Sequence, residues 1–171
     1  MEKKGTHEAI LAAKLAKEKL IILGECQDKK YWKKKIKPYF GRNVKYAGFL
    51  PYNKIVRYCA RAKVSLMPIK WDEPFGLTFI ESMACGTPVV AAGVGGIESV
   101  VRQGETGYVV KDNAPIRLAD RIAALLSRPD GDAQSASSVR ASVLRFGWPN
   151  IAEAIIEEYE LVLANYVARV C

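Results

Sequence analysis

Short apolar runs alternate with segments of helical spacing along most of the chain, and this alternation restricts the fold more than any other feature. The spacing of apolar residues predicts helices over 6–17, 28–39, 53–62, 77–85 and 97–102. A continuous apolar run predicts a strand over 20–24, and short runs rich in apolar residues predict strands over 43–47, 64–68, 88–92 and 107–110. Strands that are apolar without alternation are typical of a parallel sheet covered by helices on both faces. The predicted fold class is therefore α/β, with a Rossmann-like sheet.

The alternation begins with a helix, whereas a doubly wound sheet begins with a strand, which is commonly central. We therefore expect the first strand to be missing, so that the chain is a fragment, a late-started reading frame or a half completed by another segment. Three further helices, over 116–127, 134–145 and 150–166, follow without strands between them, and a turn is expected at 129–132. We expect one Rossmann-like domain over 1–171, with 134–171 as a helical tail.

The length and composition fit one ordinary globular domain. The chain has 171 residues, of which 50% are hydrophobic and 26% charged, so disorder is not expected. No run approaches the roughly 18 uncharged apolar residues of a membrane span. The N-terminus has neither an apolar signal core nor a small-residue cleavage site. These features argue against a transmembrane role and indicate a cytoplasmic location.

The cysteines and the histidine do not form a pattern typical of metal or nucleophilic chemistry. The four cysteines, Cys26, Cys59, Cys85 and Cys171, include no C-x-x-C pair, and His7 is the single histidine. Neither a zinc site nor a disulfide framework is expected. Cys85 is expected to pack in the core as a small apolar residue, and His7 to be exposed on the first helix. Because the chain has a single histidine, a Ser-His-Asp or Cys-His catalytic site is not favoured.

Positive charge is concentrated in the first part of the chain. The net charge is +8, with +13 in residues 1–70 and −5 in residues 71–171, which suggests an anionic ligand or surface on one side. The densest cluster alternates with aromatic and apolar residues and consists of Lys29, Lys30, Lys33, Lys34, Lys35 and Lys37. A solvated helix face is the preferred interpretation, and contact with an anionic membrane is the next. Because no base-reading motif accompanies the cluster, nucleic acid is not an expected partner.

The segment 71–88 contains the residues best suited to bind a ligand. Glu81 is the only charged residue of the expected helix 77–85 and falls at the edge of its apolar side, where an ionised carboxylate is costly unless it is hydrogen-bonded. Two hydroxyls of a ligand would satisfy it. Glu73 precedes the helix, whose first N–H groups, from Gly76 to Thr78, are expected to be unpaired and to favour an anion. This arrangement fits a phosphorylated sugar.

Other interpretations of the two glutamates remain open. Glu73 alone is equally compatible with a solvated loop carboxylate, and Glu81 with a helix residue paired to a lysine. Paired carboxylates also serve glycoside hydrolysis, but that chemistry needs carboxylates that face each other across the scissile bond. Here one glutamate is expected on a helix and the other before it, so hydrolysis ranks below phosphate binding.

Several motifs together resemble one family. They are EPFGLTFIE at 73–81, ACGTPVVA at 84–91, GGIE at 95–98, Lys-Gly at 4–5 and Phe-Gly-Trp at 146–148. This set is similar to the C-terminal, nucleotide-sugar-binding domain of retaining GT-B glycosyltransferases of the group 1 type. The likeness extends over nearly the whole chain, and a chance match of all the motifs is improbable.

The resemblance implies a role for each matching residue. Glu73 would contact the hydroxyls of the donor sugar, Glu81 would hold the ribose, and Lys4 would contact the diphosphate, without the arginine that usually accompanies it. The implied catalytic residues are Glu73 and Lys4. The implied donor-binding residues are Glu73, Phe75, Gly76, Leu77, Thr78, Glu81, Gly48 and Phe49. For Phe49, framing of the nucleotide base and plain core packing are equally open.

The function implied by the resemblance is transfer of a hexose from a nucleoside diphosphate sugar to a saccharide or lipid acceptor. No cofactor or metal is expected, because fixed positive charge can stabilise the leaving diphosphate. The acceptor-binding N-terminal domain of the family has no counterpart in this sequence, so the chain alone is expected to be inactive. The alternative is a non-catalytic module that binds a nucleotide or a sugar phosphate. A membrane or nucleic-acid binder would rest on the lysines alone.

Overall fold

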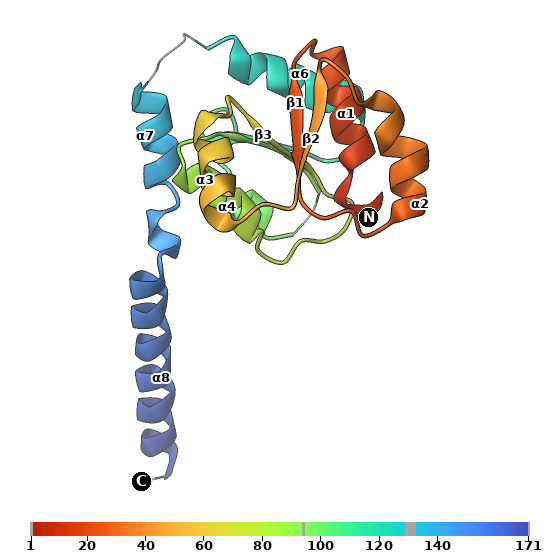
Figure 1. Cartoon of the computed structure of the whole chain (residues 1–171). Helices are drawn as coiled ribbons and strands as arrows, with labels where there is room; N and C mark the ends of the chain where they lie inside the picture. The colour runs from red at the N-terminus through yellow and green to blue at the C-terminus, as the bar shows by residue number, and fades with distance from the viewer. Residues whose placement is uncertain (1, 94, 129–132, 171) are drawn as a thin grey trace.

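Helices and parallel strands alternate in a computed structural model that describes residues 2–93, 95–128 and 133–170 (Figure 1). The strands are β1 (Leu20–Leu23), β2 (Val44–Gly48), β3 (Ser65–Pro68), β4 (Val89–Ala92) and β5 (Gly107–Val110). The helices are α1 (Thr6–Leu15), α2 (Lys29–Tyr31), α3 (Tyr52–Arg61), α4 (Leu77–Ala84), α5 (Ile97–Val100), α6 (Pro115–Leu126), α7 (Ala133–Ala141) and α8 (Trp148–Val170). Each expected strand is present with small shifts at its ends, and so is each expected helix except 28–39 and 134–145, of which α2 and α7 cover only a part. The expected turn at 129–132 lies outside the described residues.

The strands form two parallel sheets. One sheet has the order β1-β2 and the other the order β3-β4-β5. A doubly wound sheet commonly has the order 3-2-1-4-5-6. In this order, β1 to β5 correspond to the second to the sixth strand. The position of the first strand of the order therefore lies between β1 and β3. The α/β fold class is confirmed, and no strand of the described residues lies between β1 and β3.

The core lies on both faces of β4. All residues of β4 are buried, and Val89 and Val90 are fully so. One cluster joins β4 to α4, α5 and α7 and includes Phe79 and Met83. A second cluster, on the other face, joins β4 to α1 and α6 and includes Leu118. Burial on both faces explains why the central strand is an uninterrupted apolar run.

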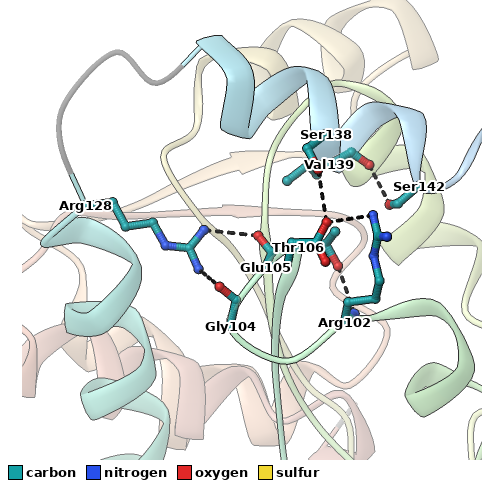
Figure 2. A network of polar contacts seen from close by, with 8 residues as sticks. All are labelled: Arg102, Gly104, Glu105, Thr106, Arg128, Ser138, Val139 and Ser142. Atoms are coloured by element: carbon teal, nitrogen blue, oxygen red, sulfur yellow. Dashed lines mark hydrogen bonds and ion pairs between the residues drawn. The ribbon is translucent and has the colours of Figure 1, made fainter.

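Hydrogen bonds and an ion pair connect α7 to the turn that precedes β5 (Figure 2). Arg128, just beyond α6, donates to the carbonyl oxygens of Gly104 and Glu105. The carboxylate of Glu105 accepts from Ser138 Oγ at 3.2 Å and lies 3.0 Å from Arg102 Nη2. This turn lies at the amino end of β5, whereas ligands of such sheets bind at the carboxyl ends of the strands. The network therefore holds helices in place at the edge away from a ligand.

The helical tail leaves the body of the domain. α7 packs against α4, and α8 projects beyond the sheets (Figure 1). The apolar side chains that α8 carries at helical spacing are exposed, with Ile155 48% and Tyr159 67% accessible. Within the described residues, the structure contains no helix that is both long and apolar enough to cross a bilayer.

The lysine-rich segment is helical, but it is not one α-helix. A π-helical turn (Trp32–Ile36) and a 3-10 turn (Lys37–Tyr39) continue α2. All six lysines are exposed, whereas the aromatic residues between them pack around Ile36. The preferred interpretation, a solvated face, agrees with this arrangement.

Two sequence expectations outside the site were wrong. His7 is half-buried, because its Nε2 lies 3.2 Å from the hydroxyl of Tyr39 and its backbone N–H donates to the hydroxyl of Tyr31. Cys85 is half-buried at the C-terminal end of α4 instead of lying in the core. The helix ends at Ala84, so Cys85 lies beyond the apolar side that its predecessors form.

Candidate functional site

The loop from β3 to α4 forms the centre of the site. It follows the carboxyl end of β3, next to the loop that follows β4, and this edge of a parallel sheet is where ligands bind. The backbone of Glu73 pairs with that of Gly95, and its carbonyl oxygen accepts from the N–H of Gly96 at 3.0 Å. A Cβ on Gly95 would lie 2.5 Å from that oxygen. The two glycines therefore allow the close approach that fixes the position of Glu73.

The N-terminal end of α4 is open. Gly76 precedes it in the left-handed conformation, with φ 83°, and a Cβ there would lie 2.1 Å from the ring of Phe79. No side chain caps the helix, and among the described residues the N–H groups of Leu77 and Thr78 have no hydrogen-bond acceptor. Both side chains are exposed. Unpaired N–H groups and the helix dipole favour an anion at this point.

Trp71 connects the two residues to which the resemblance gives catalytic roles. Its indole N–H donates to Glu73 Oε2 at 3.1 Å, and Lys4 Nζ lies 4.1 Å from the centroid of its ring. The structure thus brings Lys4 and Glu73 to one place, although they are far apart in the sequence. Sequence analysis did not single out Trp71. Its position just before the glutamate motif was the only signal available.

Glu81 lies half-buried without a charged partner. Among the described residues it forms no ion pair and no hydrogen bond, so its interpretation as a lysine-paired helix residue is wrong. Its negative charge raises the pKa of the Tyr52 hydroxyl above its ordinary value. Burial raises the pKa of the Cys59 thiol, and the charges of Cys85 and Glu81 add to this effect. The carboxylate is therefore available to hydroxyls of a ligand.

Most of the expected site residues line one open cavity of about 1700 Å³. Those that line it are Lys4, Glu73, Phe75, Gly76, Leu77, Thr78 and Glu81. Gly48 and Phe49 do not, although Gly48 is the last residue of β2 and Phe49 follows it. Phe49 is 80% exposed, so core packing is the wrong interpretation of this residue. Its contact with a nucleotide base stays a prediction.

Comparisons with known proteins identify the family. The family model described as "Glycosyl transferases group 1" matches residues 1–141. The chain belongs to this family, which confirms the resemblance to the C-terminal domain of group 1 GT-B enzymes.

Curated relatives are bacterial enzymes of greater length. D-inositol 3-phosphate glycosyltransferase of Acidothermus cellulolyticus is 40% identical over 116 residues, which are 68% of this chain and 25% of that protein. The enzyme of the same name from Xylanimonas cellulosilytica is 43% identical over 98 residues, which are 57% of this chain and 24% of that protein. The chain thus spans about a quarter of the length of these relatives.

Solved structures share the fold over almost the whole chain. Sucrose-phosphate synthase from Thermosynechococcus elongatus has a TM-score of 0.81 and 28% identity, covering 96% of this chain and 44% of that one. HepE from Anabaena, solved in complex with UDP and glucose, has a TM-score of 0.79 and 28% identity, covering 94% of this chain and 46% of that one. The likeness therefore extends to a structure in which a nucleoside diphosphate is bound.

Proposed function

We propose that this domain binds a nucleoside diphosphate sugar, with the diphosphate at the N-terminal end of α4. The observation that carries the proposal is this open helix end, because Lys4, Glu73 and the unpaired Glu81 line the same cavity as its first residues. The family supports a sugar-transfer role. The complex of HepE with UDP and glucose supports the ligand class.

In this proposal different residues bind different parts of the ligand. The N–H groups between Phe75 and Thr78 and the ammonium of Lys4 bind the diphosphate, because both supply positive charge to an anion. Glu73 accepts from hydroxyls of the sugar, and Glu81 accepts from hydroxyls of the ribose. Gly48 and Phe49 would frame the base.

We further propose that the ligand is the donor in hexosyl transfer to a saccharide or lipid acceptor. When the bond between the sugar and the diphosphate breaks, negative charge develops on the departing oxygen. Lys4 and the dipole of α4 stabilise this charge without a metal ion. The acceptor would be bound by a domain outside this chain, so we expect the chain alone to be inactive. A non-catalytic binding module is the alternative.

Calorimetry with UDP, GDP and ADP and with their sugars tests the proposed ligand class. At least one nucleotide is expected to bind to the site, and absence of binding by all of them would contradict the proposal. Measured turnover after the chain is joined to an acceptor-binding domain separates the enzyme from the non-catalytic module.

Trp71→Phe is expected to weaken binding of the nucleotide sugar that calorimetry selects by about threefold to tenfold. The loss should be smaller than that of a direct contact with the ligand, because the bond removed only positions Glu73. Binding of the nucleotide without its sugar should change little, because Glu73 is assigned to the sugar. The matched control is Tyr159→Phe, at a 67% exposed position on α8 that does not line the cavity. Equal loss with and without the sugar would contradict the role of Glu73.

A peripheral membrane contact and a cytoplasmic location stay predictions. All six lysines of the α2 segment are exposed, and within the described residues none forms an ion pair. Each lysine near an anionic surface contributes about 1 kcal/mol. We expect the protein to sediment with vesicles that contain phosphatidylserine and not with neutral ones.

Substitution of Lys33, Lys34 and Lys35 together by glutamine is expected to lower the bound fraction on anionic vesicles by at least about tenfold. The control replaces three exposed lysines outside the segment, Lys14, Lys17 and Lys19. Equal loss in both triple variants, or binding to neutral vesicles, would contradict a specific contact through the α2 segment.

A further inference from the structure

Lys70 and Glu8 form the least exposed ion pair of the described residues. Lys70 Nζ lies 2.6 Å from Glu8 Oε1, and the two side chains are 27% and 17% exposed. Apart from a 4.0 Å contact of Lys70 with Glu2, the other ion pairs join side chains that are at least 48% exposed. The second oxygen of Glu8 is buried and, within the part of the chain that the structure describes, has no hydrogen-bond partner. Such a pair is costly, because two charges lose water and one oxygen is left unsatisfied.

Tyr31, from the α2 segment, lies beside this pair. Its hydroxyl accepts from the backbone N–H of His7, the residue before Glu8, at 3.1 Å. Burial raises the pKa of the Tyr31 hydroxyl, and the negative charge of Glu8 adds to this effect. Burial lowers the pKa of Lys70, but its hydrogen bond with Glu8 and the nearby negative charges raise it by more. The ammonium of Lys70 therefore stays charged at neutral pH.

Lys70 joins the two segments that carry the residues of the proposed site. Its backbone N–H donates to the carbonyl oxygen of Lys3 at 2.9 Å, and its ammonium donates to Glu8 in the first turn of α1. Lys4 lies between these two attachments in the sequence. Lys70 also directly precedes Trp71, whose ring centroid lies 4.1 Å from Lys4 Nζ. The two attachments therefore hold the segment that carries Lys4 against the loop that carries Trp71.

The pair itself lies outside the cavity. Glu8 and Lys70 do not line it, whereas Lys4 and Glu73 do. A shift of the loop at Lys70 would move Trp71, and with it both the ring beside Lys4 and the N–H that binds Glu73. The pair thus controls the relative position of a cation and a carboxylate without touching what they bind.

We propose that the Glu8–Lys70 ion pair positions Lys4 and Glu73 for the sugar diphosphate, by holding the loop between β3 and α4 on the first turn of α1. This inference rests on the proposed function of the site. Both members of the pair are positioning residues, since neither reaches the ligand. The alternative is a purely stabilising role, in which apolar residues of similar volume replace the pair without loss, as they often do for buried ion pairs.

The indole N–H resonance of Trp71 measures this positioning in the unliganded full chain. The chain has three tryptophans, and Trp71→Phe identifies the resonance in a proton–nitrogen correlation spectrum. In Lys70→Met, exchange of this N–H with water should be about fivefold faster or more, because its bond to Glu73 is no longer maintained. Lys70→Arg keeps the charged hydrogen bond and should restore slow exchange. The matched control, Arg117→Met, breaks an exposed ion pair and should change nothing.

The double variant Glu8→Leu with Lys70→Met separates positioning from stability. It leaves no unpaired buried charge, so its melting temperature should stay within a few degrees of that of the unaltered protein. Calorimetry should nevertheless show binding of the nucleotide sugar that is weaker by about tenfold, because a displaced Lys4 loses its charged hydrogen bond to the diphosphate. Lys70→Arg should keep the affinity.

Two results would overturn the proposal. One is a double variant that keeps both the slow exchange of the Trp71 N–H and the affinity, since the pair would then only stabilise the fold. The other is unchanged exchange of this N–H in a folded Lys70→Met protein. Failure of every nucleotide to bind the unaltered protein would instead contradict the proposed function, and the Trp71 resonance would still test the pair.

Discussion

Replacement of Glu81 by alanine is expected to weaken binding of the nucleotide by about 10- to 100-fold, because hydrogen bonds to a charged group contribute about 1.5–3 kcal/mol. The carboxylate has no charged partner among the described residues, so its hydrogen-bonding capacity is left for the ligand. The fold should tolerate the change, since Glu81 is only half-buried. Calorimetry with the nucleotide that the protein binds measures the effect.

A nucleotide without the ribose 2′-hydroxyl makes this test specific. The unaltered protein should bind the 2′-deoxy nucleotide less tightly than the ribonucleotide, and Glu81→Ala should no longer distinguish the two. The matched controls are Glu157→Ala, on the exposed face of α8, and Lys33→Ala, in the α2 segment. If either control weakened binding as much as Glu81→Ala does, the assignment of Glu81 to the ribose would be refuted.

Gly76→Ala is expected to destabilise the protein by about 3 kcal/mol, since the left-handed conformation costs about 1–2 kcal/mol and overpacking about 1–3 kcal/mol. A Cβ at this position would lie 2.1 Å from the buried ring of Phe79. Either that ring or the first turn of α4 must move, and nucleotide affinity should fall with stability. Urea denaturation gives the free energy of unfolding, and calorimetry gives the affinity.

Gly48→Ala distinguishes the cost of the left-handed backbone conformation from the cost of a steric clash. Gly48 has the same φ of 83°, but a Cβ at this position would meet nothing within 4 Å. We expect its substitution to cost only the conformational part, about 1 kcal/mol. Equal destabilisation by the two substitutions would mean that Phe79 does not limit the position of the helix end.

The order of helices and strands could be predicted because it is encoded locally. The run Val89–Ala92 is apolar at every position, and the structure buries it on both faces. The glycine and proline residues around α4 marked both of its ends.

Contacts between distant segments could not be predicted. The ring of His7 contacts Tyr39, which comes 32 positions later. No local sequence pattern predicts that contact. The link from Lys4 through Trp71 to Glu73 likewise depends on how α1 meets the end of β3. The exposure of the apolar side chains of α8 could not be predicted for a related reason, because helical spacing identifies a face but not what covers it.

A crystal structure of the protein with the nucleoside diphosphate that it binds is the most direct test of the proposed site. We expect oxygens of the diphosphate at hydrogen-bond distance, about 2.7–3.2 Å, from the N–H groups of Leu77 and Thr78. Glu81 should then face the ribose. A diphosphate bound away from the start of α4, or a ribose that Glu81 does not reach, would contradict the account.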